Sequence, residues 1–363
     1  MTPDPARYPN QAPAHSAAVF DIPTRWEHGG LVLARTSSGA GSRVVGDPCI
    51  VRDERVGGWR MVLFCSPPGH AQAVCRSISD VGPGTWEFLG PLTFTNPQDG
   101  GDGATHKPYI VQDAWRPNHA ARIGGRYMLV SVSYTGTPRH KYVHRAWATD
   151  LAGPWTWDAE PLIPAGGPGE FDEKHTDAVS GIYFPEKDEC VYFYMGYPRA
   201  VQTRAISPFG SAQGVAVERM TERNLRKLGV ILPPQQQAGH WASGWVGGLQ
   251  VVPGKQHRWI ALANASPTAP VPDQDDSISR EEPPPSLGGW AYCDEPYPVK
   301  GWRWSDRPLE WIEDLPPHAI ANGEGVNLWR HYLLMLPDGR AAVFYNSGPY
   351  GREQLYVKWA AGV

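Results

Sequence analysis

Carboxylate side chains next to apolar segments are the residues of this sequence best suited to chemistry. Asp47 precedes PCIV and Asp177 precedes AVSGIYF, while Glu173 lies in FDEKHTD and Glu324 in NGEGVNLWRHY. Cleavage of a glycosidic bond uses two carboxyl groups: one acts as base or nucleophile, and the other protonates the leaving oxygen. The acid of such a pair needs a pKa raised by burial or by a neighbouring carboxylate.

Polar and aromatic side chains accompany the carboxylates at comparable places. Those expected to bind a substrate are His106, Lys107, His175, Trp245, Asn327, Arg330 and His331. The indole faces of Trp245, Trp241 or Trp329 are suited to stack on a sugar ring, although a single Trp more often fills the core between sheets. His175 or His331 is an alternative proton donor.

Five similar segments position these residues. Each has a short apolar strand, a turn with Gly, Pro or Asp, and a second apolar strand; the segments begin at Asp47, Lys107, Asp177, Gly247 and His331. The spacings between successive starts are 60, 70, 70 and 84 residues. A third strand and a Trp-bearing fourth follow most pairs, as in GTWEF, GPWTW and KGWRW. Four antiparallel strands repeated five times predict an all-β fold, a five-bladed β-propeller.

The two ends of the chain are expected to meet in one blade. The last repeat ends one strand short at LYVKWAAGV, and residues 29–37, GGLVLARTS, supply an outer strand that closes the ring. Closure of this kind leaves no free sheet edge. A pair of β-sandwiches or a jelly roll is the alternative, but the repeat period exceeds the strand spacing of about 8–12 residues that sandwiches show.

The whole chain, residues 1–363, is predicted to form one domain with two irregular segments. Residues 1–28 are an N-terminal extension, and residues 266–286 are a Pro-rich acidic insertion. A solvated loop is the favoured interpretation of the insertion, and a flap over a site is the alternative. Only residues 220–229, MTERNLRKLG, resemble a helix, and they equally fit the outer edge of the third blade.

Composition excludes several classes of protein. The 363 residues include 40 Gly and 37 Pro, which disfavours a helical bundle, and 41% are hydrophobic, which excludes a disordered chain. The formal net charge of −4 shows no excess of basic residues that would attract nucleic acid or an anionic membrane, so neither is expected as a partner. No apolar stretch of 18 residues and no secretory signal is visible, so a cytoplasmic location is expected.

The sequence calls for no metal or cofactor. The five cysteines lack CxxC spacing and are expected to be buried, reduced thiols. There is no HExxH motif, no EF-hand loop and no phosphate-cradling glycine pattern. A single ion held by His331 or His106 in the central channel is compatible with the fold, but nothing requires it.

Short motifs resemble the five-bladed propeller glycosidases of families 43, 62, 32, 68, 117 and 130. Residues 46–64, GDPCIVRDERVGGWRMVLF, resemble their first blade, in which an Asp–Pro near the start of the inner strand often carries the catalytic Asp; Asp47 matches it. Residues 175–197, HTDAVSGIYFPEKDECVYFYMGY, resemble a later blade, particularly of the mannoside phosphorylase family, and this likeness places Asp177 at the channel. THKPYIV occupies the second-blade slot, where it offers His106 and Lys107 in place of an Asp.

The fourth repeat departs from that resemblance. SGWVGGLQVV has no Glu where family 43 enzymes often keep the general acid. The prediction is therefore Asp47 as base, Glu324 or Glu173 as acid, and Asp177 as the carboxylate that orients the substrate or tunes a pKa.

The expected function is a glycoside hydrolase acting on a small or terminal sugar unit. A glycoside phosphorylase is one alternative, with Lys107, His175, Arg330 and His331 available for phosphate. A non-catalytic sugar-binding propeller is the other. The five segments begin with Asp, Lys, Asp, Gly and His, and such different residues favour one asymmetric central site over repeated binding sites.

Overall fold

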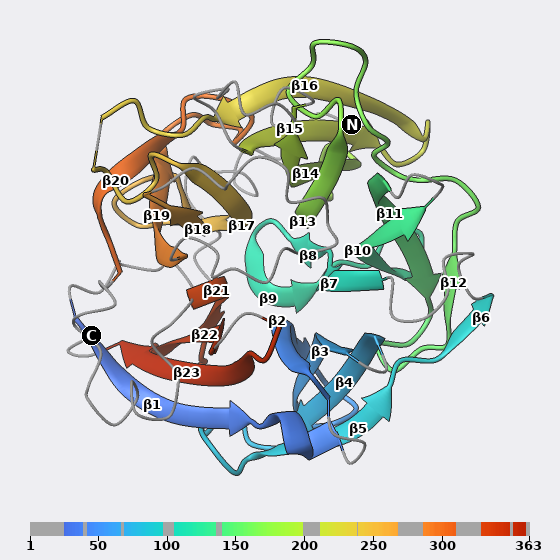
Figure 1. The fold of residues 1–363 in the computed structure, drawn as a ribbon. Helices are drawn as coiled ribbons and strands as arrows, with labels where there is room; N and C mark the ends of the chain where they lie inside the picture. Colours follow the sequence, from blue (N-terminus) through green and yellow to red (C-terminus); the bar gives the residue numbers. More distant parts are fainter. Residues whose placement is uncertain are drawn as a thin grey trace.

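The protein is built almost wholly of β-strands, which form five sheets around a central axis in the computed structural model (Figure 1). The structure describes residues 25–38, 42–66, 69–96, 105–135, 140–198, 211–237, 239–267, 286–309, 328–348 and 351–360. Within these ranges the one helical element is a short 3₁₀ turn, η1 (Arg35–Ser38). The predicted five-bladed β-propeller is confirmed, and we number the sheets as blades 1 to 5 in chain order.

Three blades have the order expected of a simple antiparallel meander, with the first strand of each innermost. Blade 1 consists of β2 (Val44–Asp53), β3 (Gly58–Ser66), β4 (Gly69–Cys75) and β5 (Trp86–Pro91). Blade 4 consists of β17 (Trp245–Pro253), β18 (Trp259–Ser266), β19 (Leu287–Cys293) and β20 (Arg303–Pro308). Blade 5 consists of β21 (Leu328–Met335), β22 (Ala341–Ser347), β23 (Gln354–Ala360) and, as its outer strand, β1 (Trp26–Leu33).

Blades 2 and 3 carry additional strands. Blade 2 consists of β7 (Thr105–Ile110), β10 (Tyr127–Thr135), β11 (His140–Ala148), β12 (Trp155–Trp157) and the short parallel β6 (Phe94–Asn96). Blade 3 consists of β13 (His175–Phe184), β14 (Glu189–Tyr197), β15 (Ala212–Arg219) and β16 (Asn224–Leu232). The hairpin of β8 (Gln112–Asp113) and β9 (Arg116–Ala120) joins its inner edge, with β8 parallel to β13.

The ring closes as the sequence predicts. β1 pairs antiparallel with β23, so the first and last described strands complete one sheet (blue beside red in Figure 1). The strand begins at Trp26 and stops at Leu33, a few residues earlier than expected, because the chain turns into η1 at Arg35.

Residues 220–229 are not helical. The chain turns at residues 220–223 and then enters β16, the outer strand of blade 3, whose side chains alternate between exposed and partly buried. That alternation is the period of a strand with one covered face.

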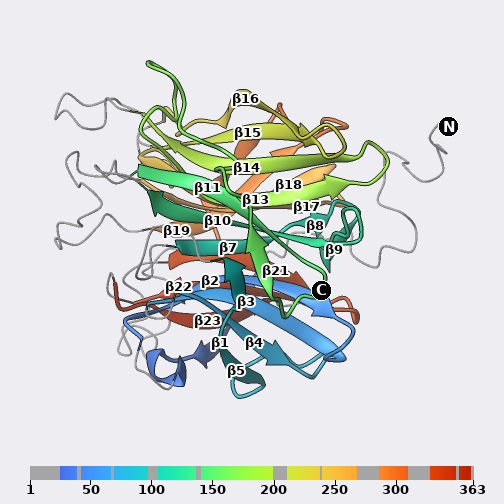
Figure 2. The same cartoon turned by 90° about the vertical axis from the view of Figure 1, so that its right-hand side faces the viewer.

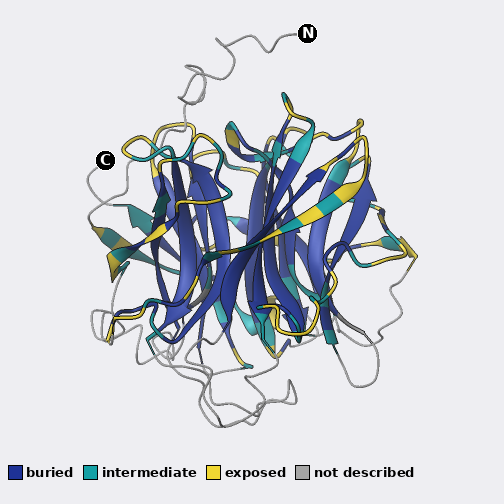
Figure 3. Ribbon diagram, turned by 90° about the horizontal axis from the view of Figure 1, so that it is seen from above, coloured by how far each residue is buried: buried dark blue, intermediate teal, exposed yellow. Residues whose placement is uncertain are grey.

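Apolar side chains fill the space between the blades. Figure 3 shows the strands largely buried, with exposure concentrated in the connections. Tryptophans of the outer strands serve this packing: Trp86 of β5, Trp155 and Trp157 of β12, and Trp304 of β20 are each 8% exposed or less. No helix in the described part of the chain has the length and hydropathy needed to cross a membrane.

Candidate active site at the channel mouth

All five inner strands contain a β-bulge at the same level. The pairing registers skip at residues 47–48 of β2, 107–108 of β7, 178–179 of β13, 247–248 of β17 and 330–331 of β21. We call this end of the channel the mouth. A bulge re-aims the side chains next to it, and bulges are frequent beside active sites.

Four of these bulges hold a residue other than glycine in the left-handed region. The φ angles are 51° at Asp47, 56° at Lys107, 42° at Ala178 and 48° at Arg330. Such a conformation costs on the order of 1 kcal/mol per residue and clusters at functional sites. The bulges also explain why the expected starts of the repeats lie two or three residues inside the observed strands: the repeating feature is the bulge.

Asp47 is held by a side chain from the neighbouring blade. Its backbone N–H donates to Oδ1 of Asn346 at 2.7 Å, and Nδ2 of Asn346 donates to Oδ1 of Asp47 at 3.0 Å. A Cβ on Gly46 would overlap the Asn346 side chain, so this approach requires glycine there. Asp47 is 6% exposed, which makes it an ordered carboxylate at the mouth.

Asp177 is fully buried between two lysines. Lys107 Nζ lies 2.6 Å from its Oδ1 and Lys141 Nζ lies 3.3 Å from its Oδ2, while the backbone N–H of Ala178 also donates to Oδ1 at 2.6 Å. Burial alone would raise the pKa of Asp177, but the two ammonium groups outweigh it and hold that pKa well below its usual range. Asp177 therefore stays ionised near neutral pH and does not serve as a proton donor there.

Glu353 is a carboxyl group at the mouth that the sequence analysis did not select. It lies just before β23, its carbonyl accepts the N–H of Val45 at 3.0 Å, and its side chain is only 5% exposed. Burial, opposed by backbone N–H groups of the turn at residues 351–353 and reinforced by the charge of Asp47, raises its pKa to about 7. A carboxyl group with a raised pKa thus lies within reach of the charge of Asp47 on the adjacent blade, and a raised pKa is what a proton donor in acid catalysis needs.

Arg330 lies within the channel. A Cβ on Gly248 would overlap its guanidinium. The absence of a side chain at Gly248, in the β17 bulge, therefore leaves the space that Arg330 fills. A small cavity beside it is lined by Pro48, Tyr109, Gly248, Leu249, Gln250, Arg330, His331 and Tyr332. The mouth therefore presents Lys107, Lys141 and Arg330 together with Asp47, Asp177 and Glu353.

The channel is blocked below the mouth by a polar network. The Tyr332 hydroxyl donates to the Ile50 carbonyl at 2.5 Å and accepts from Gln112 at 2.6 Å and Asn118 at 3.2 Å. Gln112 and Asn118 belong to the β8–β9 hairpin, which occupies the other end of the channel (Figure 2). Among the described residues, these contacts separate the mouth from the other end of the channel.

The remaining predicted site residues lie at different distances from this centre. The charges of Lys107 and Asp177 act on His106, and burial together with Lys107 holds the pKa of His106 well below its usual range. Nδ1 of His175 accepts the backbone N–H of Lys141 at 3.2 Å, next to the ion pairs of Asp177. Trp245 packs with Ala178 and Met195, between blades 3 and 4.

Two predicted residues have other surroundings, although His331 also borders the cavity beside Arg330. The imidazole of His331 stacks on Tyr345, with ring centroids 5.6 Å apart, and a Cβ on Gly288 would overlap it, so the ring lies between blades 4 and 5. Glu173 accepts the N–H of Gly169 at 2.9 Å and closes an exposed turn. Glu324 and Asn327 lie outside the described residues, as do most of the 266–286 segment and the side chain of Trp329. Trp241 is 1% exposed in the core of blade 4, where its N–H donates to Ser305.

Lys141, Asn346 and Glu353 are the mouth residues that sequence reasoning missed. None lies on an inner strand: Lys141 is in β11, Asn346 is in β22, and Glu353 precedes β23. The available signal was a charged or amide residue at the mouth-side end of a second or third strand. Among the described residues, no group of three or more His, Cys, Asp or Glu side chains is placed to hold a metal ion.

Comparison with known proteins identifies structures of the same fold, but no matching family and no matching curated protein. Similar solved structures include a thermostable family-43 glycoside hydrolase, with 12% identity, a TM-score of 0.57 and coverage of 86% of this chain and 88% of that one. The catalytic domain of a family-62 α-L-arabinofuranosidase from Coprinopsis cinerea has 12% identity, a TM-score of 0.58 and coverage of 93% and 98%.

An endo-arabinase from Bacteroides thetaiotaomicron is similar to the same degree, with 11% identity, a TM-score of 0.57 and coverage of 92% and 98%. In each case the match spans nearly the whole of both chains, at an identity that shows the fold alone. The chain therefore has the five-bladed β-propeller fold of family-43 and family-62 glycoside hydrolases.

Proposed function

We propose that this protein is a glycoside hydrolase with its active site at the channel mouth. The observation that carries the proposal is the pair formed by Asp47 and Glu353. Asp47 is an ordered carboxylate at a left-handed bulge, and Glu353, within the reach of its charge, has its pKa raised to about 7. Hydrolysis of a glycosidic bond needs one group of each kind.

The two carboxyl groups divide the chemistry between them. Glu353 gives its proton to the leaving glycosidic oxygen as the bond from that oxygen to the anomeric carbon breaks. Asp47 takes a proton from a water molecule, whose oxygen bonds to the anomeric carbon. Asp177 transfers no proton; it fixes the ammonium groups of Lys107 and Lys141, which are then placed to bind sugar hydroxyl oxygens or a negatively charged substituent.

The substrate class we propose is a glycoside of a pentose. Support comes from the structural neighbours, whose names include an α-L-arabinofuranosidase, an endo-arabinase and an endo-1,4-β-xylanase. The space at the mouth is consistent with a small substrate, because Arg330 and the Tyr332 network fill the channel behind it.

Hydrolysis of aryl glycosides by wild type and variants tests the proposal. We expect turnover of 4-nitrophenyl α-L-arabinofuranoside or β-D-xylopyranoside, and loss of at least about 10²-fold in kcat on replacing Asp47 by Asn. Glu353→Gln should lose activity on substrates with poor leaving groups and retain it on dinitrophenyl glycosides, which leave without a proton. Glu324→Gln and Glu173→Gln are the matched controls, because these two residues are the other predicted acids. If either variant loses activity on poor leaving groups but keeps it on dinitrophenyl glycosides, that residue is the acid instead of Glu353.

A sugar-binding propeller without catalysis is the second candidate. The fourth-blade bulge favours it, because Gly247 and Gly248 stand where related enzymes often carry the acid and Arg330 fills the space. Sugar binding by calorimetry with no turnover of any aryl glycoside, with or without phosphate, would establish it. Turnover that appears only with added phosphate would instead identify a phosphorylase.

A further inference from the structure

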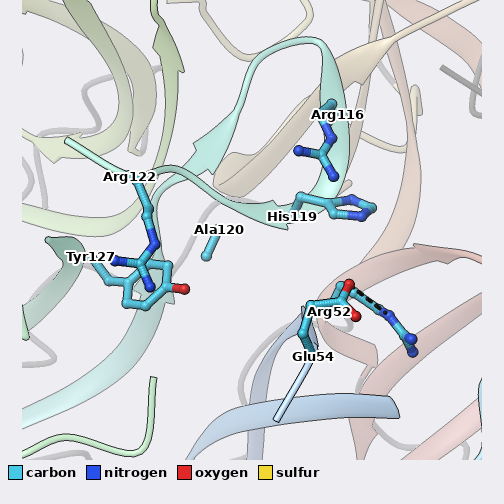
Figure 4. A pocket seen from close by; sticks show the side chains of 7 residues that line it. All are labelled: Arg52, Glu54, Arg116, His119, Ala120, Arg122 and Tyr127. Atoms are coloured by element: carbon cyan, nitrogen blue, oxygen red, sulfur yellow. Dashed lines mark ion pairs between the residues drawn. The ribbon is translucent and has the colours of Figure 1, made fainter. Parts of the chain in front are cut away.

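A second cavity lies at the end of the channel opposite the mouth. It measures about 200 Å³ and is lined by Arg52, Glu54, Arg116, His119, Ala120, Arg122 and Tyr127 (Figure 4). Arg52 is five residues beyond Asp47 on β2, a separation of roughly 16 Å along an extended strand. The Tyr332 network lies between the two sites, so this cavity is separate from the proposed active site.

Positive charge predominates around this cavity. Three arginines line it against one carboxylate, that of Glu54. Arg52 lies 3.4 Å from Glu54, but the Glu54 side chain is 80% exposed, so solvent weakens that pair. The backbone of Arg116 pairs with Asp113, but its guanidinium has no ion-pair or hydrogen-bond partner among the residues that the structure describes.

Two of the arginines are held in place. Arg52 is 14% exposed and donates to the Gly58 carbonyl at 3.0 Å. Arg122 donates to the Gly125 carbonyl at 3.0 Å, and its guanidinium lies 4.5 Å from the centre of the Tyr127 ring. Guanidinium groups that are already ordered lose little entropy on binding, and their fork geometry matches carboxylate and phosphate oxygens.

His119 adds an acceptor to this basic site. Its Nδ1 lies 3.1 Å from the Pro117 carbonyl, which only accepts, so Nδ1 carries the proton. Burial and the Arg116 charge lower the pKa of His119, which leaves Nε2 unprotonated near neutral pH. A neutral Nε2 accepts a hydrogen bond from a hydroxyl group of a ligand.

We propose that this cavity binds a small hydroxylated ligand through an oxyanion, a carboxylate or a phosphate group, held by Arg52, Arg116 and Arg122. An acidic sugar has this chemistry: an anionic group for the arginines, a hydroxyl for His119 and a ring that fits beside Tyr127. The volume suits one small ligand, because sites for drug-sized molecules measure about 300–1,000 Å³.

Isothermal titration calorimetry at low ionic strength tests the proposal. The probes are inorganic phosphate, D-galacturonate and, as the uncharged comparison, D-galactose. We expect the two anions to bind and galactose to bind at least about tenfold more weakly, because charge-assisted hydrogen bonds are lost. Binding of galacturonate alone would assign the site to carboxylates, and binding of phosphate alone to phosphates.

Variants locate the binding. Arg116→Gln combined with Arg122→Gln should weaken anion binding at least about tenfold, whereas Glu54→Gln should strengthen it by removing the one negative charge. The matched control is Arg76→Gln, because Arg76 is 71% exposed and pairs only with Glu87 among the described residues. No anion binding by wild type, an equal loss in the control, or a loss caused instead by Lys107→Gln at the mouth would overturn the proposal.

Discussion

Asp47 lies in the bulge of β2 and Asp177 directly precedes the bulge of β13, and their different partners give the two carboxylates different properties. Asp47 exchanges hydrogen bonds with a neutral amide, whereas Asp177 is buried with two ammonium groups. Breaking a buried ion pair from one side leaves uncompensated charge, which is costly. Loss of activity on mutation therefore has a different meaning at each position.

Replacing each aspartate by Asn separates the two roles. Asp47→Asn should change the free energy of unfolding by less than about 1 kcal/mol, because Asn tolerates a positive φ and still offers an oxygen to Asn346. Asp177→Asn should cost about 3 kcal/mol, since Lys107 and Lys141 then lack their counter-charge. Urea unfolding at pH 7 measures both, and equal losses would contradict the distinction.

The ionisation of Asp177 also predicts how the free energy of unfolding changes with pH. Its folded pKa is depressed, so its contribution to stability is present above the ordinary carboxyl pKa of 3.8 and is lost as the pH falls below that value. The acid side of the stability profile should be flatter in Asp177→Asn than in wild type.

The protonation of Glu353 predicts how activity depends on pH. A group acting as acid with a pKa of about 7 is charged and inactive above that pH, so kcat/KM should fall tenfold per pH unit on the alkaline side. In Glu353→Gln, residual activity on dinitrophenyl glycosides should lose this alkaline limb. An unchanged limb in the variant would assign the acid to another residue.

At the scale of elements, the sequence predicts the strands better than their ends. The alternation of polar starts and apolar runs located the inner strands, because burial on both faces demands continuous apolar segments. The predicted strand starts fall at the bulges because the prediction relied on a polar residue at each start. The first residues of β2, Val44 and Val45, are apolar and do not mark a strand end. Lys141 and Glu353 were missed for a related reason: their position at the mouth depends on how the second and third strands return, which no local pattern records.

The β8–β9 hairpin is the element that local patterns describe least well. Residues 112–120 resemble a polar turn within the second repeat, yet they join the sheet of blade 3 and block the channel. Asn118 is the key residue of this contact. Its side chain donates to the Leu333 carbonyl at 2.9 Å and accepts the N–H of Met335 at 2.9 Å, at a φ of 60°.

Substitution of Asn118 tests how the hairpin is anchored. Asn118→Ala should destabilise the protein by about 3 kcal/mol, because two buried backbone groups of β21 lose their partners. Asn118→Gly keeps the positive φ but not the hydrogen bonds, so a similar loss there would assign the effect to the bonds. If Asn118→Gly instead has the wild-type free energy of unfolding in urea, the destabilisation of Asn118→Ala comes from backbone strain at the positive φ.

For the whole molecule, the position of the two ends in one sheet determines how the ring unfolds. β1 contributes the outer strand of blade 5, and its inward side chains pack into the same core as blades 1 and 2. Detaching β1 would expose the edge of β23 and the apolar surface beneath it. A propeller closed in this way should unfold as one cooperative unit, since no blade keeps its packing when the ring opens.

Two leucines of β1 test this cooperativity. Leu33 is 3% exposed, whereas Leu31, two residues earlier on the same strand, is 38% exposed and serves as the matched control. Leu33→Ala should cost about 3 kcal/mol and Leu31→Ala less than about 1 kcal/mol, because only the first leaves a cavity. Both should retain a single urea transition with the wild-type m-value, as blade 5 and the rest of the ring lose structure together. A second, earlier transition in Leu33→Ala would mean that blade 5 opens independently, and that Asp47 and Glu353, which lie on blades 1 and 5, separate before the protein unfolds.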